Sequence, residues 1–134
     1  FDFTAASICL SKAVEIWVEE KVVRPLVEIE GLGELLEDER GHQIPASEAT
    51  LGDTEKFLKE VAYKIWKDPR RNAVNLRFPK ISTGNIASFR KSLREIKDEY
   101  RNDWAHKKIM KMETYEEFRE FAPNFFKTWV PKWK

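Results

Sequence analysis

Apolar residues recur at intervals of three and four along most of the chain, which is the period of an α-helix. Between positions 4 and 29 they are Ile8, Val14, Trp17, Val18, Val22, Leu26 and Ile29. Pro25 interrupts this run, and because proline lacks an amide donor and clashes with the preceding turn, it predicts a kink or the start of a second helix. Cys9 falls within the pattern and is expected to be a small core residue.

The segment 31–52 is expected to be mostly irregular, with a short helical turn over Glu34–Glu39. A second helix is predicted from Asp53, a good N-cap residue. Its apolar face contains Phe57, Leu58, Val61, Ala62, Ile65 and Trp66. KDPRRN ends this helix, because the residue before a proline disfavours helical conformation. The stretch AVNLRFPKIS that follows is expected to be extended or irregular.

The third predicted helix has the clearest pattern. From Ile86, steps of 3, 4, 3, 4 and 4 lead to Phe89, Leu93, Ile96, Tyr100 and Trp104. A last helix is predicted from TYEE, where Thr114 and Glu117 have capping-box spacing, and Pro123 is expected to divide it into two pieces. Several amphipathic helices with short connections predict an all-α fold, an up-and-down bundle of four to five helices.

The composition suits one globular domain over residues 1–134. Apolar residues make up 42% and charged residues 35% of the chain, and no apolar run approaches the roughly 18 residues that a membrane span needs. The first residue is Phe1 and not Met, so we expect a domain excised from a longer protein. With one cysteine, no intramolecular disulfide is possible, which favours a cytoplasmic location.

The net charge of +1 gives no global electrostatic argument for nucleic-acid binding. On the third helix, however, one narrow sector beside the apolar seam gathers Arg90, Arg94, Lys97, Arg101 and Lys108. We call these five residues the basic row. Two interpretations stand: the row guides an RNA backbone, or its long side chains merely flank the apolar seam and reach water.

A second basic stretch, KDPRRNAVNLRFPK, surrounds Phe78 with Lys67, Arg70, Arg71, Arg77 and Lys80. Cations around an aromatic ring resemble an RNA-binding footprint, in which the ring stacks on a base. An exposed linker explains the same residues equally well. Elsewhere, His42 lies on a polar loop and is expected to face solvent. Core packing explains the C-terminal aromatics better than base stacking, although Trp133 is a candidate for docking on a neighbouring domain or chain.

The stretch DEYRNDWAHKK, residues 98–108, holds the candidate chemistry. An imidazole, here His106, titrates near neutrality, so it can move the proton of a ribose 2′-hydroxyl. A guanidinium, here Arg101, presents a fork of donors to a phosphate, and the Asn102 amide can orient either group. Because RNA supplies its own nucleophile, no metal or cofactor is expected, and DNA would not be cut.

Spacing limits how these three side chains can meet. Asn102 and His106 are four apart and share a helix face. Arg101 lies well around a straight helix from His106, so one phosphate would reach both only through a bend or a second chain. The alternative is that all three are ordinary residues at a helix end, where a histidine complements the helix dipole.

YRNDWAH after an amphipathic helix, followed by ETYEEFREFAPNFF, resembles the HEPN superfamily. Arg101, Asn102 and His106 fill the places of its Arg–polar–gap–His signature. The resemblance implies a helical bundle that pairs about a two-fold axis, with two motifs forming one composite active site. It implies a metal-independent endoribonuclease that leaves a 2′,3′-cyclic phosphate, acting as a toxin, in antiphage defence or in RNA processing.

The resemblance also implies partners: RNA, a second copy of the chain, and an antitoxin or adjacent domains of a longer protein. Some HEPN domains are non-catalytic and serve as dimerisation or docking modules, so this alternative function stays open. The chain departs from an ideal RNA-cleaving site because Asp98, Glu99 and Asp103 flank the motif and make it less cationic.

Overall fold

The computed structural model describes residues 4–67, 71–101 and 112–134. Within these ranges the chain forms helices and no β-strand, and an isolated bridge joins Glu37 and Gln43. In chain order the elements are α1 (Thr4–Val18), η1 (Glu19–Val23), α2 (Arg24–Val27), η2 (Gly33–Leu35), η3 (Ala46–Glu48), α3 (Leu51–Lys67), α4 (Arg71–Arg77), α5 (Thr83–Glu95), η4 (Ile96–Arg101) and α7 (Met112–Trp129). The predicted all-α helical bundle is confirmed.

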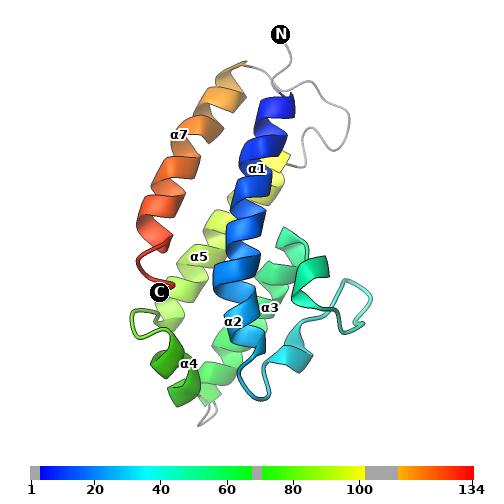
Figure 1. Cartoon of the computed structure of the whole chain (residues 1–134), viewed down its shortest axis with the longest axis vertical. Helices are drawn as coiled ribbons and strands as arrows, with labels where there is room; N and C mark the ends of the chain where they lie inside the picture. Colours follow the sequence, from blue (N-terminus) through cyan, green and yellow to red (C-terminus); the bar gives the residue numbers. More distant parts are fainter. Residues whose placement is uncertain (1–3, 68–70, 102–111) are drawn as a thin grey trace.

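The long helices lie side by side along the longest axis of the molecule (Figure 1). α5 runs opposite to α3 and α7, while α1 and α3 run the same way because the irregular segment 28–50 returns the chain between them. α4 lies at the end of the bundle where α3 ends and α5 begins, and η4 leads toward the other end. Among the described residues, no helix combines the length and the apolar character needed to cross a bilayer.

Pro25 starts a new helical segment, which was one of the two predicted outcomes. α1 continues into the π-helix η1, after which the Arg24 amide donates to the Glu19 carbonyl, and then into α2, whose first turn contains Pro25. Cys9 is exposed, so its predicted place in the core is wrong. The buried face of α1 passes through Ser7, Ser11 and Val14, and Cys9, about 200° around the helix from Ser7, lies opposite to it.

The helix α3 begins two residues earlier than predicted. Its cap is Thr50 and not Asp53: Thr50 Oγ1 accepts the Asp53 amide at 3.1 Å, and Asp53 Oδ2 accepts the Thr50 amide at 3.0 Å. The two residues therefore form a reciprocal capping box, with Asp53 in its third position. Before it, the predicted turn over Glu34–Glu39 is realised as a single 3-10 turn, Gly33–Leu35.

The apolar face of α3 is buried as predicted except at its end. Phe57, Leu58, Val61 and Ile65 are at most 5% exposed, whereas Trp66 is 69% exposed. Trp66 follows Ile65 by about 100° around the helix, which carries its side chain out of the buried sector. The assignment of Trp66 to the core is therefore wrong.

The predicted irregular stretch AVNLRFPKIS is helical as far as Arg77, so the prediction is wrong there, whereas residues 78–82 are irregular as predicted. α4 spans Arg71–Arg77, and the Phe78 amide still donates to the Val74 carbonyl at 2.8 Å. Val74 and Phe78, four residues apart, are both almost fully buried. Their shared face packs the short helix against the core, and tertiary packing of this kind outweighs a weak local propensity.

The helix α7 runs without a break past Pro123, against the prediction of two pieces. Ala122 and Phe125 are buried on either side of the exposed proline, so packing holds the helix where its hydrogen-bond ladder lacks a donor. The predicted capping box of Thr114 and Glu117 is wrong as well, because both residues lie inside a helix that is already formed at Met112.

Aromatic rings form the centre of the core. Phe89 is fully buried, with ring centroids 5.7 Å from Phe125, 5.0 Å from Trp129 and 5.2 Å from Trp133. Trp133 is only 3% exposed and also meets Phe78 at 5.0 Å. Core packing of the C-terminal aromatics is thus confirmed, and Trp133 is not available for docking on another domain or chain.

Candidate functional site

The helix α5 orients the basic row. Ser82 Oγ accepts the Asn85 amide at 3.1 Å, and Asn85 Oδ1 accepts the Ser82 amide at 3.1 Å, a capping box that starts the helix at Thr83. The predicted apolar seam is buried over its described part: Ile86, Phe89, Leu93, Ile96 and Tyr100. Because the seam faces the core, the neighbouring basic side chains emerge along its border.

Three members of the basic row converge on one carboxylate of α3. Glu55 Oε1 lies 2.6 Å from Arg94 Nη2 and 3.6 Å from Arg90 Nη2, and Glu55 Oε2 lies 3.8 Å from Lys97 Nζ. Arg94 Nε also donates to Glu55 Oε1 at 3.0 Å. This hydrogen bonding, together with the charge of Glu55, raises the pKa of Arg94. These three members of the basic row are therefore held against α3 by ion pairs.

Besides Glu55, a second carboxylate meets this group: Asp98 Oδ1 lies 3.8 Å from Lys97 Nζ. The Arg94 side chain is 52% exposed and faces solvent beyond Glu55. The Arg90 side chain is 20% exposed, and its Nε is buried without a hydrogen-bond partner among the described residues. Of the three, Arg94 is the best placed to contact a phosphate from solution.

The element that leads into the candidate motif is a π-helix. η4 continues α5 from Ile96 to Arg101. Near its end, Tyr100 is 6% exposed and stacks on Phe118 of α7, with centroids 4.6 Å apart and an angle of 7° between the rings. Burial, and secondarily the charge of Glu99, raises the pKa of Tyr100. The backbone immediately before Asn102 is thus fixed against α7.

The motif itself lies largely outside the described residues. The structure places the backbone of Arg101 at the end of η4 but not its side chain. Asn102, His106 and Lys108 all fall in the stretch 102–111, which the structure does not describe. Whether the three motif side chains meet stays a prediction.

The second basic stretch differs from its predicted form. Arg70 is outside the described residues, and of Arg71 only the backbone, at the start of α4, is described. Phe78 is fully buried, so it cannot stack on a base. The guanidinium carbon of Arg77 lies 4.6 Å from the centre of its ring, covering that edge of the core.

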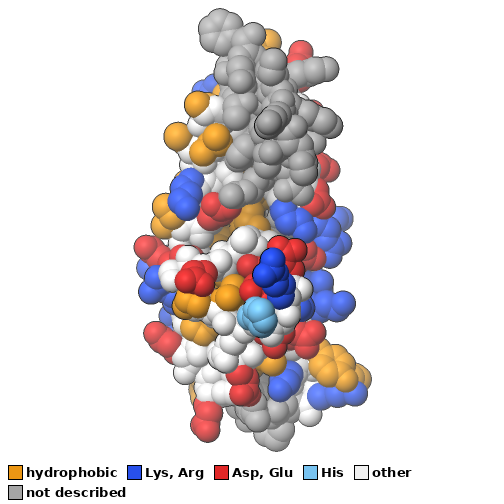
Figure 2. Space-filling model, turned by 90° about the vertical axis from the view of Figure 1, so that its right-hand side faces the viewer, with side chains coloured by type: hydrophobic (Ala, Val, Ile, Leu, Met, Phe, Trp, Pro, Cys, Tyr) orange, Lys and Arg blue, Asp and Glu red, His pale blue; other side chains and the backbone are white. Residues whose placement is uncertain are grey.

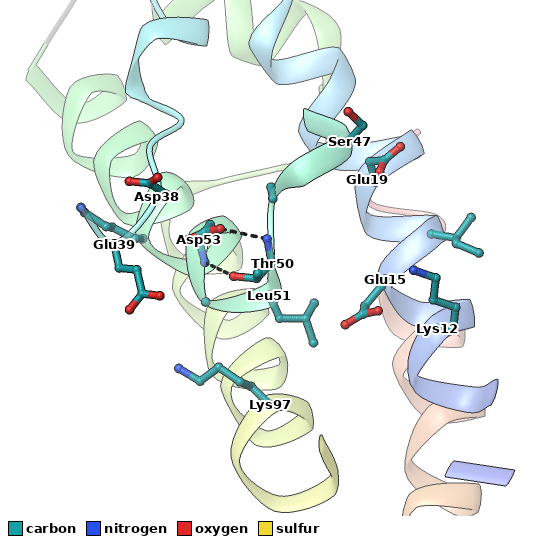
Figure 3. A pocket seen from close by; sticks show the side chains of 14 residues that line it. Lys12, Glu15, Glu19, Asp38, Glu39, Ser47, Thr50, Leu51, Asp53 and Lys97 are labelled. Atoms are coloured by element: carbon teal, nitrogen blue, oxygen red, sulfur yellow. Dashed lines mark hydrogen bonds between the residues drawn. The ribbon is translucent and has the colours of Figure 1, made fainter. Parts of the chain in front are cut away.

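A groove of about 900 Å³, which sequence reasoning missed, opens beside the basic row. Three segments distant in sequence line it: α1, the stretch 38–56, and η4 through Lys97 (Figure 3). Lys12 and Glu15 face it from α1, opposite Lys97 and the start of α3. No local motif marks a cavity that forms only when three separate segments pack together.

The groove carries charges of both signs. Basic and acidic residues line it, among them Lys12, Lys56, Lys97, Glu15, Asp38 and Glu39. Figure 2 shows basic and acidic side chains mixed on one face of the molecule. Several of its carboxylates already have partners: Glu19 pairs with Arg24 at 2.8 Å, Asp53 accepts the Thr50 amide, and Asp38 accepts two backbone amides of its own loop. Within the described ranges, no cluster of three or more His, Cys, Asp or Glu side chains is placed to bind a metal ion.

His42 faces solvent as predicted, with 73% of its side chain exposed and Nδ1 3.8 Å from Asp38 Oδ2. It lies on a loop, and this exposure makes it a useful control for the other histidine of the chain.

Comparisons with protein-family models, with curated proteins and with solved structures gave no match. The resemblance to the HEPN superfamily therefore rests on the motif residues and on their place after an amphipathic helix.

Proposed function

We propose that this domain is a HEPN-type endoribonuclease that cleaves RNA by attack of the ribose 2′-hydroxyl on the adjacent phosphate. One observation carries the proposal: the helix that leads to the motif changes from α-helix to the π-helix η4, which is described as far as Arg101. π-helical segments cost hydrogen-bond geometry and occur frequently at functional sites. Here the irregular segment occurs at the residue where the Arg–Asn–x–x–x–His sequence begins.

Local packing supports the same site. Tyr100 is stacked on Phe118, and Ile96 is fully buried, so both ends of η4 are anchored. A reaction that depends on position requires side chains carried by a rigid backbone. The turn that carries Arg101 meets this requirement.

In the proposed mechanism, His106 takes the proton from the 2′-hydroxyl and returns a proton to the leaving 5′-oxygen. Arg101 binds the phosphoryl oxygens, on which negative charge grows in the transition state. Asn102 orients the imidazole or the phosphate, and Arg94 and Lys97 guide the RNA backbone. The product is a 2′,3′-cyclic phosphate, and no metal is needed, because the nucleophile is part of the substrate.

The proposed active form is a homodimer. Arg101 and His106 are five residues apart, and a second chain related by two-fold symmetry brings one motif opposite the other. An RNA-cleaving domain of this kind fits a toxin, antiphage or RNA-processing role, in which an antitoxin or an adjacent domain restrains it. These biological roles follow from the resemblance and are part of the proposal.

The direct test replaces His106 by Ala and measures cleavage of a labelled RNA in EDTA. Loss of a general acid–base should lower the rate by about 10²- to 10⁴-fold while helicity and dimerisation persist. The matched control is His42→Ala, because His42 is the other histidine of the chain and is exposed on a loop. Unchanged cleavage by the His106→Ala variant, or cleavage of DNA, refutes the mechanism.

A mixing experiment tests the composite site. Two-fold symmetry gives the shared cleft two equivalent pairings of Arg101 from one chain with His106 from the other. Arg101→Ala and His106→Ala chains are each inactive alone, but a mixed dimer keeps one of the two pairings intact. At equal concentrations, about a quarter of the wild-type activity should return. If each site is built from one chain, the mixture stays inactive and the two-chain arrangement is wrong.

A further inference from the structure

Two large aromatic side chains face solvent on α3. Tyr63 is 56% exposed and Trp66 is 69% exposed. Tyr63 lies two residues from both Val61 and Ile65, about 200° around the helix from each, and so points away from the buried side. Aromatic rings that the fold does not bury commonly mark an interaction surface.

Cations accompany these rings. Lys67 Nζ lies 5.0 Å from the Tyr63 ring centre and 5.7 Å from the Trp66 ring centre. Lys59, also exposed, precedes Tyr63 by four residues and therefore lies on the same side of the helix. We call Lys59, Tyr63, Trp66 and Lys67 the Lys–aromatic face. Glu60, exposed at its edge, is an acidic residue of the same helix turn.

The surrounding sequence concentrates positive charge. Of the 24 basic and 23 acidic residues of the chain, residues 59–80 hold seven and two, which leaves 17 and 21 for the rest. This stretch includes the C-terminal half of α3 and all of α4, at the end of the bundle away from Arg101 (Figure 1). A nearly neutral chain thus has one strongly basic stretch of sequence.

We infer that the Lys–aromatic face binds single-stranded RNA. Every base has a flat π face that can stack on Trp66 or Tyr63, and the ammonium groups of Lys59 and Lys67 contact the phosphates between the bases. A duplex hides its base faces, so it does not fit the exposed rings. The charge excess distinguishes this partner from a neutral apolar one.

This inference corrects and replaces the predicted role of Phe78, which is buried. It also goes beyond the proposed cleavage, because the end of α3 that carries the Lys–aromatic face lies at the opposite end of the bundle from Arg101. The Lys–aromatic face binds the RNA strand and takes part in no chemical step.

The test measures binding and avoids cleavage by using chains that carry His106→Ala. A fluorescent oligouridine of about 12 nucleotides is titrated and followed by anisotropy. Trp66→Ala should weaken binding by about 5- to 150-fold, and Trp66→Phe, which keeps a stacking ring, should stay within about threefold of the parent. The matched control is Ile16→Ala, which removes another exposed apolar side chain, 48% exposed on α1.

The lysine is tested by the salt dependence of binding. Removing one phosphate contact with Lys67→Gln should reduce the slope of log K against log salt by about 0.7. Binding by Trp66→Ala equal to that of the parent overturns the inference, as does equal affinity for a duplex of the same length. Loss of binding in Trp66→Ala supports the inference even where no RNA cleavage is found. Failure of the proposed binding face and failure of the proposed nuclease activity can therefore be told apart.

Discussion

The replacement of Trp133 by Ala tests how the C-terminal tail contributes to the fold. Trp133 lies beyond the last helix, yet it is 3% exposed and contacts Phe78 and Phe89, the latter at the centre of the aromatic core. If this packing is the reason for the tail's conformation, truncating the indole opens a cavity in the core. If the tail instead docks on another molecule, the substitution should leave the free energy of unfolding of the isolated domain almost unchanged.

The expected loss of unfolding free energy combines the buried area of the indole with one smaller contribution of opposite sign. A tryptophan buries about 150–250 Å², worth roughly 4–6 kcal/mol as an upper limit at about 25 cal/mol per Å². Trp133 Nε1 is buried without a partner among the described residues, and removing such a donor returns about 1–3 kcal/mol. We therefore expect Trp133→Ala to lower the free energy of unfolding by about 2–4 kcal/mol.

The assay is urea unfolding followed by far-UV circular dichroism, with the slope m checked for two-state behaviour. The matched control is Trp66→Ala, because Trp66 is 69% exposed and its loss should change stability by no more than about 0.5 kcal/mol. Trp133→Phe keeps a ring without the unpaired donor and should recover most of the loss. Equal midpoints for Trp133→Ala and Trp66→Ala would refute the packing argument.

Two further predictions follow from charges near the basic row. Glu55→Gln removes the carboxylate that Arg94 contacts at 2.6 Å, so RNA should bind more tightly, and the slope of log K against log salt should be steeper by about 0.7. The control is Glu120→Gln, on the exposed side of α7, which should leave this slope unchanged. An unchanged slope in Glu55→Gln contradicts the proposal that Glu55 competes with RNA for Arg94. Burial raises the pKa of Tyr100 above its ordinary value of 10.0, so stability is complete below pH 10 and falls as the pH rises through the folded-state pKa. In unfolding measured between pH 8 and about pH 11, Tyr100→Phe should remove that part of the alkaline loss, and parallel curves for the two proteins would contradict it.

The elements that sequence reasoning predicted correctly are those whose apolar period is regular. The seam from Ile86 to Tyr100 is buried at every predicted position in the described residues, because a step of three or four fixes a helix face whatever the neighbours are. The same rule failed for Trp66 and Cys9. Cys9 lies opposite the buried face of α1, and Trp66 lies about 80° around α3 from the buried Leu58. At both positions the apolar residue type predicted burial that the position on the helix does not give.

Local propensity was less reliable than packing. Pro123 lacks a donor, yet α7 passes through it because Ala122 and Phe125 hold the helix against the core. The stretch around Val74 and Phe78 has only a short apolar pattern, and it becomes helical because both side chains are buried together. Neither outcome follows from the residues nearest in sequence.

The candidate site was predicted in part. The members of the basic row that the structure describes with their side chains, Arg90, Arg94 and Lys97, lie together on α5 and η4, but their partner Glu55 lies 39 residues before Arg94, on another helix. A helical wheel shows which residues share a face, but it does not show which other element packs against that face. The groove beside the row was missed for the same reason, since α1 and the stretch 38–56 supply most of its lining.

The two basic surfaces should therefore contribute differently to an encounter with RNA. A phosphate that approaches Arg94 competes with Glu55, which already accepts two hydrogen bonds from that guanidinium, so the exchange yields little net affinity. The ammonium group of Lys67 lies over two exposed rings, and a base that stacks there can bring its phosphate close without breaking the ion pair between Arg94 and Glu55. Since attraction over a distance follows local charge and not the net charge of +1, the strand should engage the Lys–aromatic face first. The row on α5 then acts on a strand that is already held, where it sets direction more than affinity.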